Sequence, residues 1–269
     1  MKAIGFIIII ILNLTFRIYG QENSTFKPYS PNFYILSKGE WNYSLFSKGE
    51  YGLSDKVSLK IHPVWLFFAP SIALKWTWIK TEKYSFSFLH GLSSPTPIMN
   101  LLAKKGTGGL ISPEFDIPFM LCIENKLIFA LNLQGGHKVI GDFGMEFALF
   151  NDKLLPGSSI DLPVISPRSA VYYKKFGVDI GLSLEGNLFG KFDYYSKAQG
   201  FMFPLMNENY KNEYGLTGRY FGELTGMLFW NTSKRCKVGV GPRLCYGDYP
   251  FGEKWHLLPM FDFVRYSKK

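Results

Sequence analysis

A histidine and a serine stand three residues apart in the segment His-Gly-Leu-Ser-Ser, as His90 and Ser93. A serine nucleophile needs a base within hydrogen-bond reach and a third group that orients the base. No acidic residue lies near this pair in the chain. The simpler interpretation is a strand that leads into a Ser-Ser-Pro turn. A lipid-modifying barrel enzyme that uses His90 and Ser93 stays as an alternative.

The other residues that could bind metal or cross-link are few and scattered. Four histidines show no His-x-x-x-His spacing, and the three cysteines show no Cys-x-x-Cys spacing. Cys236 and Cys245 fall on one expected strand, about 30 Å apart, which is too far for a disulfide. We therefore predict no metal, no cofactor and no disulfide, and Cys122 is expected to pack like the other two.

Two basic segments invite a ligand. Residues 104–109, Lys-Lys-Gly-Thr-Gly-Gly, lack the order of a phosphate-binding loop and are interpreted as a hairpin tip, with contact to lipopolysaccharide phosphates as the alternative. Residues 234–237, Lys-Arg-Cys-Lys, are interpreted as a solvated turn that faces the periplasm. The positive charges are scattered, so nucleic-acid binding is not predicted.

A row of charged and polar side chains alternates with apolar ones. If the apolar row faces lipid, the charged row lines the lumen of a barrel and can form internal ion pairs. The lumen-lining candidates are Lys60, His62, Lys75, Asp179, Glu185, Arg219, Glu223 and Arg243.

The elements that carry these residues follow a period of two. The clearest example runs through residues 178–185, where Val, Ile, Leu and Leu alternate with Asp, Gly, Ser and Glu. The segments are about nine to fifteen residues long, more than the five or six usual in soluble strands. Short turns are expected at 52–56, 81–83, 124–126 and 231–235, and longer loops at 93–113, 204–213 and 246–255.

Composition and strand rhythm together predict the fold class. The 269 residues are 47% hydrophobic and 17% aromatic, which excludes disorder and favours strands. We predict an all-β fold, a closed antiparallel transmembrane up-and-down β-barrel of about 12 strands over residues 40–269, with 10 or 14 as alternatives. Closure is required because an open edge in hydrocarbon leaves backbone groups unpaired. The expected interfacial girdle consists of Trp41, Tyr51, Trp65, Trp78, Tyr84, Trp230, Tyr246, Trp255 and Tyr266.

The first residues predict export, and together with the barrel they predict the outer membrane of a Gram-negative bacterium as the location. Residues 1–20 contain a basic start and an apolar run too short to span a bilayer, which is typical of a signal peptide. Cleavage is expected after Gly20, with an uncleaved membrane anchor as the alternative. Residues 21–39 are expected to form a periplasmic lead-in.

Two stretches resemble a group of uncharacterised outer-membrane β-barrel proteins of Bacteroidota. They are residues 51–63 with 69–75, and residues 249–252 with 258–264. Phe261, Phe263 and Tyr266 are also similar to the aromatic last strand that barrel-assembly machinery recognises, although three residues follow it here. The resemblance implies a barrel over most of the chain and carries no known chemistry.

These features favour a monomeric outer-membrane barrel that serves as a narrow pore or a structural component. Its expected partners are outer-membrane lipid, lipopolysaccharide and the assembly machinery. The alternation by itself also fits a soluble exported barrel with its apolar row inward around an apolar ligand. That alternative and the lipid-modifying enzyme both stay open at this point.

Overall fold

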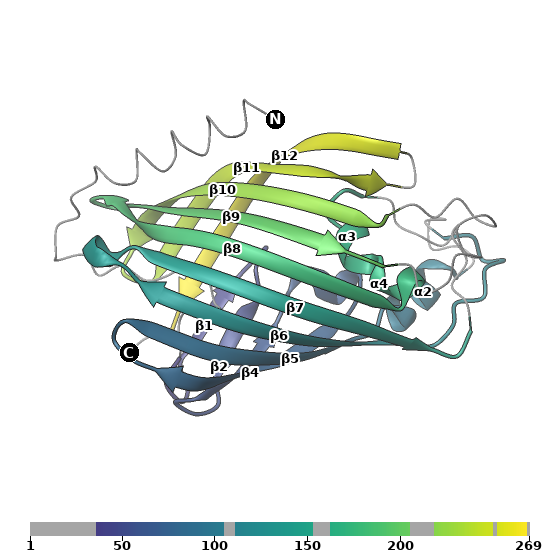
Figure 1. Ribbon diagram of the computed structural model, residues 1–269, viewed down its shortest axis with the longest axis horizontal. Helices are drawn as coiled ribbons and strands as arrows, with labels where there is room; N and C mark the ends of the chain where they lie inside the picture. Colours follow the sequence, from purple (N-terminus) through teal and green to yellow (C-terminus); the bar gives the residue numbers. More distant parts are fainter. Residues whose placement is uncertain (1–35, 105–110, 153–161, 205–217, 250–251, 268–269) are drawn as a thin grey trace.

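The computed structural model describes residues 36–104, 111–152, 162–204, 218–249 and 252–267. Twelve antiparallel strands follow one another around a closed barrel, and the last strand pairs with the first, which confirms the predicted fold and strand number (Figure 1). The strands are β1 (Trp41–Ser44), β2 (Gly49–Gly52), β3 (Val57–Ile61), β4 (Ser71–Lys80), β5 (Tyr84–Ser93), β6 (Met120–Asn132), β7 (Lys138–Phe150), β8 (Phe176–Phe189), β9 (Phe192–Met202), β10 (Tyr220–Ser233), β11 (Cys236–Tyr249) and β12 (Gly252–Tyr266).

The two ends of the barrel differ in their connections. The turn end, on the left in Figure 1, joins strands by short turns, one of which contains the 3-10 helix η2 (Gln134–Gly136). The loop end, on the right, carries the 3-10 helix η1 (Val64–Phe67) and the helices α2 (Thr96–Leu102), α3 (Ser166–Ser169) and α4 (Val171–Lys174). Within the described ranges, no helix is long and apolar enough to cross a membrane.

Two of the expected connections are wrong. Residues 124–126 lie inside β6, because Glu124 and Lys126 face the lumen and only look like a turn in the sequence. The expected loop at 246–255 is instead strand on both sides, since β11 continues to Tyr249 and β12 begins at Gly252.

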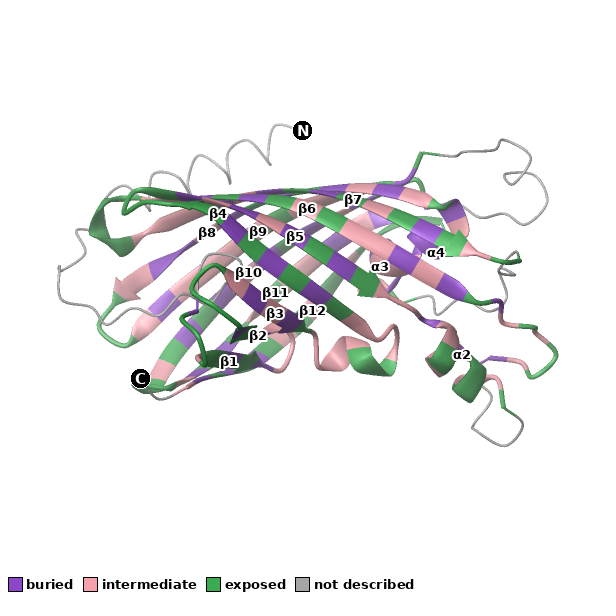
Figure 2. Ribbon diagram, turned by 90° about the horizontal axis from the view of Figure 1, so that it is seen from below, coloured by how far each residue is buried: buried purple, intermediate pink, exposed green. Residues whose placement is uncertain are grey.

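The apolar rows face outward. On β8, the Leu182 side chain is 59% exposed and its neighbour Ser183 only 3%. Figure 2 shows the same alternation of exposed and buried residues along the neighbouring strands. A soluble barrel would bury the apolar row, so this arrangement is that of a transmembrane barrel.

Aromatic residues mark the height of the apolar band. Trp78 and Trp230 are exposed on the outer face near the turn end, and Tyr220 and Trp255 near the loop end. Tyr220 and Trp230 are ten residues apart on β10, about 33 Å along the strand and about 25 Å after a tilt of roughly 40°. That height matches the apolar band of outer-membrane barrels. Tyr266 does not belong to the girdle, because it is buried inside against Lys237.

The wall of the barrel is uneven in height. We call β6–β11, with 11 to 14 residues each, the tall wall. We call β1–β3, with four or five residues each, the low wall. A strand needs about 9–11 residues to cross a bilayer, so the low wall covers only part of the membrane.

Candidate functional site

The turn-end half of the lumen is filled by buried ion pairs, which we call the seal. Lys75 Nζ lies 2.7 Å from Glu50 Oε1, and Lys60 Nζ lies 3.9 Å from Glu50 Oε2. Across the lumen, Lys237 Nζ donates to Asp193 Oδ2 at 2.6 Å. All five side chains are at most 2% exposed. Buried charges of this kind require partners, and here each has one of opposite sign.

Amide side chains complete the seal around Asp193. Asn187 Nδ2 donates to Asp193 Oδ1 and Asn231 Nδ2 to Asp193 Oδ2, both at 2.8 Å. Glu185, on β8, is fully buried and lies opposite Lys138 of β7 in the strand register. The adjacent strand therefore extends the same pairing of opposite charges.

A second ionic group lies on the tall wall. Lys126 Nζ lies 2.7 Å from Asp179 Oδ1, 3.5 Å from Glu124 Oε1 and 3.6 Å from Asp142 Oδ1. Lys197 Nζ approaches the other oxygen of Asp142 at 3.5 Å. Two lysines and three carboxylates thus hold β6, β7, β8 and β9 together from the inside.

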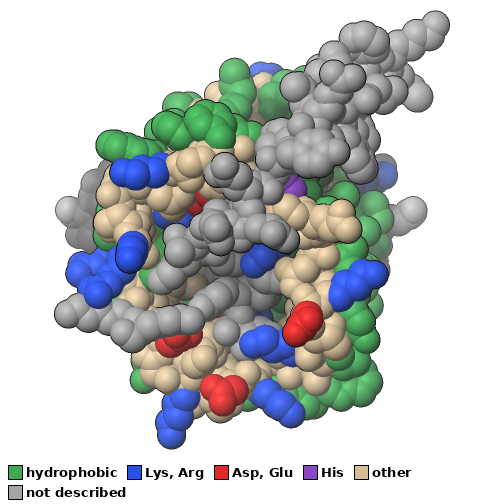
Figure 3. Space-filling view, turned by 90° about the vertical axis from the view of Figure 1, so that its left-hand side faces the viewer, with side chains coloured by type: hydrophobic (Ala, Val, Ile, Leu, Met, Phe, Trp, Pro, Cys, Tyr) green, Lys and Arg blue, Asp and Glu red, His purple; other side chains and the backbone are tan. Residues whose placement is uncertain are grey.

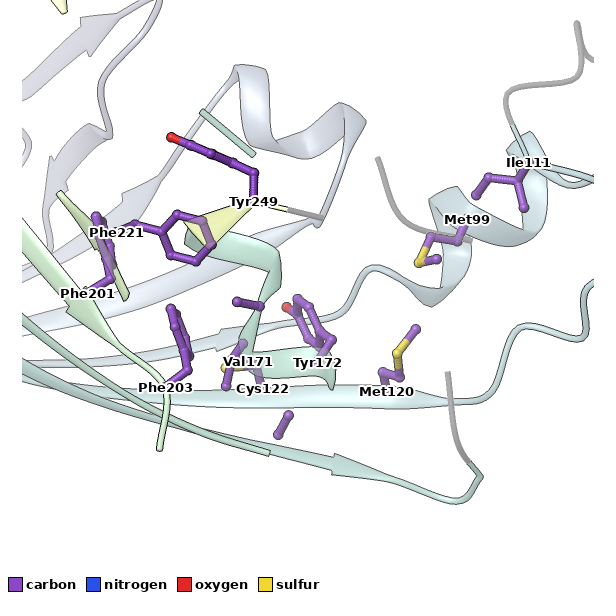
Figure 4. Packing of buried hydrophobic residues seen from close by; sticks show 12 residues of the cluster. Met99, Ile111, Met120, Cys122, Val171, Tyr172, Phe201, Phe203, Phe221 and Tyr249 are labelled. Atoms are coloured by element: carbon purple, nitrogen blue, oxygen red, sulfur yellow. The ribbon is translucent and has the colours of Figure 1, made fainter. Parts of the chain in front are cut away.

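The loop-end half of the lumen is closed by an apolar cluster, which we call the plug. Val171 and Tyr172 of α4 pack with Cys122 of β6 and Phe203 (Figure 4). The Tyr172 hydroxyl lies 2.8 Å from Ser93 Oγ. Burial raises the pKa of the Tyr172 hydroxyl, so this group stays protonated and tied to the wall.

Between the seal and the plug lies a cavity of about 300 Å³, which we call the central chamber. Its charged lining consists of Lys48, Lys60, Lys126, Arg168, Lys197, Arg243, Glu124, Glu146, Glu223 and Asp262. Aromatic side chains also line it, namely Phe46, Trp65, Phe68, Tyr172, Tyr173, Tyr195, Phe201 and Phe261. One ligand could therefore place a polar group against the charged side chains and an apolar group against the aromatic ones.

Two arginines of the chamber differ in how many of their hydrogen-bond donors are already used. Arg168, from α3, binds Glu223 with both nitrogens of its fork, one of them at 2.7 Å from Oε2. Arg243 donates through Nε to Thr225 Oγ1 at 3.1 Å, while its NH1 lies 3.9 Å from Glu223. Glu223 is thus already held by Arg168, and Arg243 retains donors that can reach a further anion.

The candidate lumen residues fall into three places. Lys60, Lys75, Asp179, Glu185 and Glu223 are buried inside the barrel, in the seal or the ionic groups, and Lys60 and Glu223 also line the central chamber. His62, in the loop after β3, and Arg243, on β11, line the central chamber. Arg219 is exposed just before β10 begins, and so lies at the loop-end mouth rather than on the lumen wall.

Several other charged residues of the ion pairs inside the barrel were missed in the sequence. They are Glu50, Glu124, Lys126, Asp142, Arg168, Asp193, Lys197 and Lys237. Strand alternation was a usable signal for most of them, because they share the inward parity of their strands. Arg168 gave no such signal, since it comes from a four-residue helix that folds into the lumen.

The structure does not bring His90 and Ser93 together. Residues an odd number apart on a strand point to opposite faces. His90 is exposed on the outer face of β5 with its Nδ1 2.7 Å from Asn125 Oδ1, whereas Ser93 points inward to Tyr172. The barrel wall separates the two side chains that a hydrolase would need in contact.

The remaining predictions concern metal, cysteine and basic segments. Among the described residues, no three His, Cys, Asp or Glu side chains are grouped to hold a metal ion. Cys122, Cys236 and Cys245 are free, and the latter two lie on β11. The basic segment after Lys104, and the predicted signal peptide, lie outside the described residues.

Basic side chains surround the turn end. Figure 3 views this end and shows Lys and Arg around its rim, with apolar side chains outside them. The exposed basic residues at the turns are Lys56, Lys80, Lys83, Lys191, Lys234 and Arg235. Such a rim suits anionic headgroups at the edge of a membrane.

No family model and no curated protein sequence matches the chain. Solved structures with a similar fold include a bacterial polysaccharide outer membrane secretin, with 8% identity, TM-score 0.44, 85% of this chain and 70% of that one covered. LpxR from Salmonella typhimurium is 9% identical with TM-score 0.43, over 85% of this chain and 90% of that one. A loop L8 deletion mutant of OmpT, an outer membrane protein of Vibrio cholerae, is 10% identical with TM-score 0.44, over 82% and 62%. Likeness of this degree says nothing about substrate or activity.

Proposed function

We propose that this protein is an outer-membrane barrel that holds a small ligand in its central chamber and does not conduct solutes freely. The observation that carries the proposal is the position of the chamber between the buried seal and the apolar plug. The seal leaves its lysines and carboxylates at most 2% exposed, so water does not reach them along the axis. A narrow pore would need a wetted path at this level.

The location follows from the surface. The apolar band with its aromatic girdles suits the outer membrane of a Gram-negative bacterium, reached by means of the predicted signal peptide. The short turns would face the periplasm and the long loops the exterior. Outer-membrane lipid, lipopolysaccharide and the barrel-assembly machinery are the partners that this placement implies, and the likeness to Bacteroidota barrels stays a prediction.

Single-channel recording in planar bilayers tests the closed lumen. The wild-type barrel should give no steady conductance. The double variant Glu50→Ala with Lys75→Ala should give an open channel, because it removes two large side chains and the charges that held them. Ser183→Ala, which trims an inward side chain of the tall wall outside the ion pairs, serves as the control.

Folding of each variant is checked by gel mobility in SDS, boiled against unboiled. A stable open conductance of the wild-type protein would contradict the proposal and favour the narrow pore. A folded double variant without conductance would show that the seal does not close the lumen.

A further inference from the structure

The barrel has a gap in its wall beside β12, which we call the seam. β12 pairs with β11 from Gly252 to Arg265, but with β1 only at Val264, Arg265 and Tyr266. From Leu257 to Phe261, no strand in the described part of the chain pairs with the other edge of β12. In Figure 1 the loop-end part of β12 lies at the upper border of the sheet, with no strand drawn beside it. The β1–β2 turn, residues 45–48, borders the seam on its turn-end side.

Asp262 is the residue at which strand pairing stops. Its Oδ1 accepts the backbone N–H groups of Leu45 at 3.0 Å and Phe46 at 3.1 Å, and its Oδ2 accepts the Ser44 hydroxyl at 2.6 Å. The Leu45 N–H also reaches the Phe263 carbonyl oxygen at 3.2 Å, so the ladder extends to that residue, and the carboxylate takes the next donor, the Phe46 N–H. The end of the pairing is specified by a buried side chain and does not reflect a missing residue.

Pro259 protects the edge that is left. It lies opposite Pro242 of β11, and neither proline has an N–H to give. Such a pair fits only the register position where the nitrogens point away from each other. The nitrogen of Pro259 then faces the seam and removes one backbone donor from an edge that would otherwise pair or need water.

The central chamber passes through the wall at the seam. The cavity that contains Lys126 and Arg168 is also lined by Ile72 and Phe261, which are 47% and 57% exposed on the outer face. The rings of Phe46 and Phe261 meet edge to face at 4.8 Å at its margin. A molecule in the hydrocarbon could therefore reach the ionic interior sideways, without using the axis.

The seam and the central chamber together favour an amphiphilic ligand. The seam is aromatic and apolar, and lies within the band that faces lipid. Most cations of the chamber behind it already face carboxylates, as Lys126 and Lys197 do in the second ionic group and Arg168 does at Glu223. Arg243 differs, because its Nε donates to a hydroxyl and its NH1 lies 3.9 Å from Glu223. Its remaining donors favour an anionic group inside, and the apolar seam favours an acyl chain outside.

We propose that the seam is a lateral entrance through which a phospholipid with a net negative headgroup places that headgroup in the central chamber. The headgroup meets Arg243 and Lys48, and the acyl chain lies along Phe46, Trp65 and Phe261. This inference names the ligand of the proposed function and rests on it.

Photo-cross-linking in nanodiscs of phosphatidylglycerol or phosphatidylcholine tests the entrance. Benzoylphenylalanine replaces Met260, a half-buried chamber residue beside the seam, and lipid adducts are measured by mass spectrometry. Phosphatidylglycerol should give about tenfold more adduct than phosphatidylcholine, because only its headgroup offers a net negative charge to the cations. Arg243→Gln in the same background should reduce the difference.

Two control positions bracket the result. The probe at Leu182, on the lipid face, should react with both lipids, and the probe at Phe229, buried in the turn-end half, with neither. If the Met260 variant does not fold, Phe46 carries the probe instead. Absence of adduct at a folded seam variant, with adduct at Leu182, would overturn the proposal.

Two further outcomes identify other occupants. Equal adducts from both lipids would show an apolar crevice without headgroup recognition. Loss of the adduct on adding inorganic phosphate would show a site for free anions. Each contradicts the lateral lipid entrance, whereas the closed lumen is judged separately by conductance.

Discussion

The tall wall and the low wall are built from the same alternation of residues, yet only the tall wall crosses the whole apolar band. Along the tall wall, strands of 11 to 14 residues cross the whole apolar band and carry ion pairs on their inner face. Along the low wall, strands of four or five residues, about 13–17 Å long, end part-way through it. The last strand can therefore pair with the first, which closes the barrel, while part of the wall between them stays open across the membrane.

Prolines and polar turns shorten the low wall. Pro63 and Pro70 flank η1 between β3 and β4, and proline cannot donate to a ladder. On the other side, Asp262 ends the pairing of β1 with β12. The low wall is thus limited by residues that cannot or do not extend the strands, whereas in the tall wall β11 continues on both sides of Pro242.

The largest contrast is expected from breaking a buried ion pair. Lys237→Ala leaves Asp193 buried without its cation and should lower the free energy of unfolding by about 3–5 kcal/mol. Lys48→Ala, whose side chain is 30% exposed beside Glu124, should cost at most about 1 kcal/mol. Urea unfolding from vesicles measures both. Equal losses of unfolding free energy for the two variants would contradict the view that the ion pairs of the seal are shielded from water and that of Lys48 is not.

The second contrast places a charge on each outer face. Leu182→Arg puts a guanidinium in hydrocarbon and should cost about 2–4 kcal/mol if the residue lies at the midplane. Phe261→Arg, at the seam, should cost less than about 1 kcal/mol, because the side chain can turn into the polar chamber. The same unfolding measurement decides, and a seam variant as costly as Leu182→Arg would mean that the seam is closed.

The third contrast is a matched pair of glycines on β7. A Cβ at Gly144 would meet Asp179 and lie 2.7 Å from Lys126 Cε, so Gly144→Ala should cost about 1–3 kcal/mol by overpacking the ionic group. A Cβ at Gly141 meets nothing within 4 Å, and Gly141→Ala should be neutral or stabilise by up to about 1 kcal/mol. Thermal unfolding in detergent compares them. A neutral Gly144→Ala would show that the inside of the tall wall is loosely packed.

The smallest effect on stability is expected at the open edge. Pro259→Thr adds one backbone donor to β12 and should change the free energy of unfolding by less than about 1 kcal/mol. It should also increase cross-linked dimers in vesicles, since edges without proline pair more readily. Unchanged oligomeric state at high protein density would argue that the edge is already covered.

The residue alternation by itself determined most of the fold. Rows such as 178–185 predicted strands, because side chains on a strand change face at every residue. Eleven to thirteen such segments, together with the even strand number of bacterial barrels, predicted twelve strands, which the structure confirms. The same parity placed Lys75 and Asp179 on one face. Which face meets lipid was inferred from strand length and aromatic positions, because alternation looks the same in a soluble barrel.

Only the tertiary structure decided which charges meet and where the wall opens. Lys126 and Asp179 are 53 residues apart, and Asp262 and Phe46 are 216 apart, so their contacts depend on the register of distant strands. The four-residue helices α3 and α4 are too short to show a helical period, and they are stable because the lumen buries them. The seam likewise arises because β12 extends farther toward the loop end than β1. This difference in strand length cannot be recognised from either sequence segment alone.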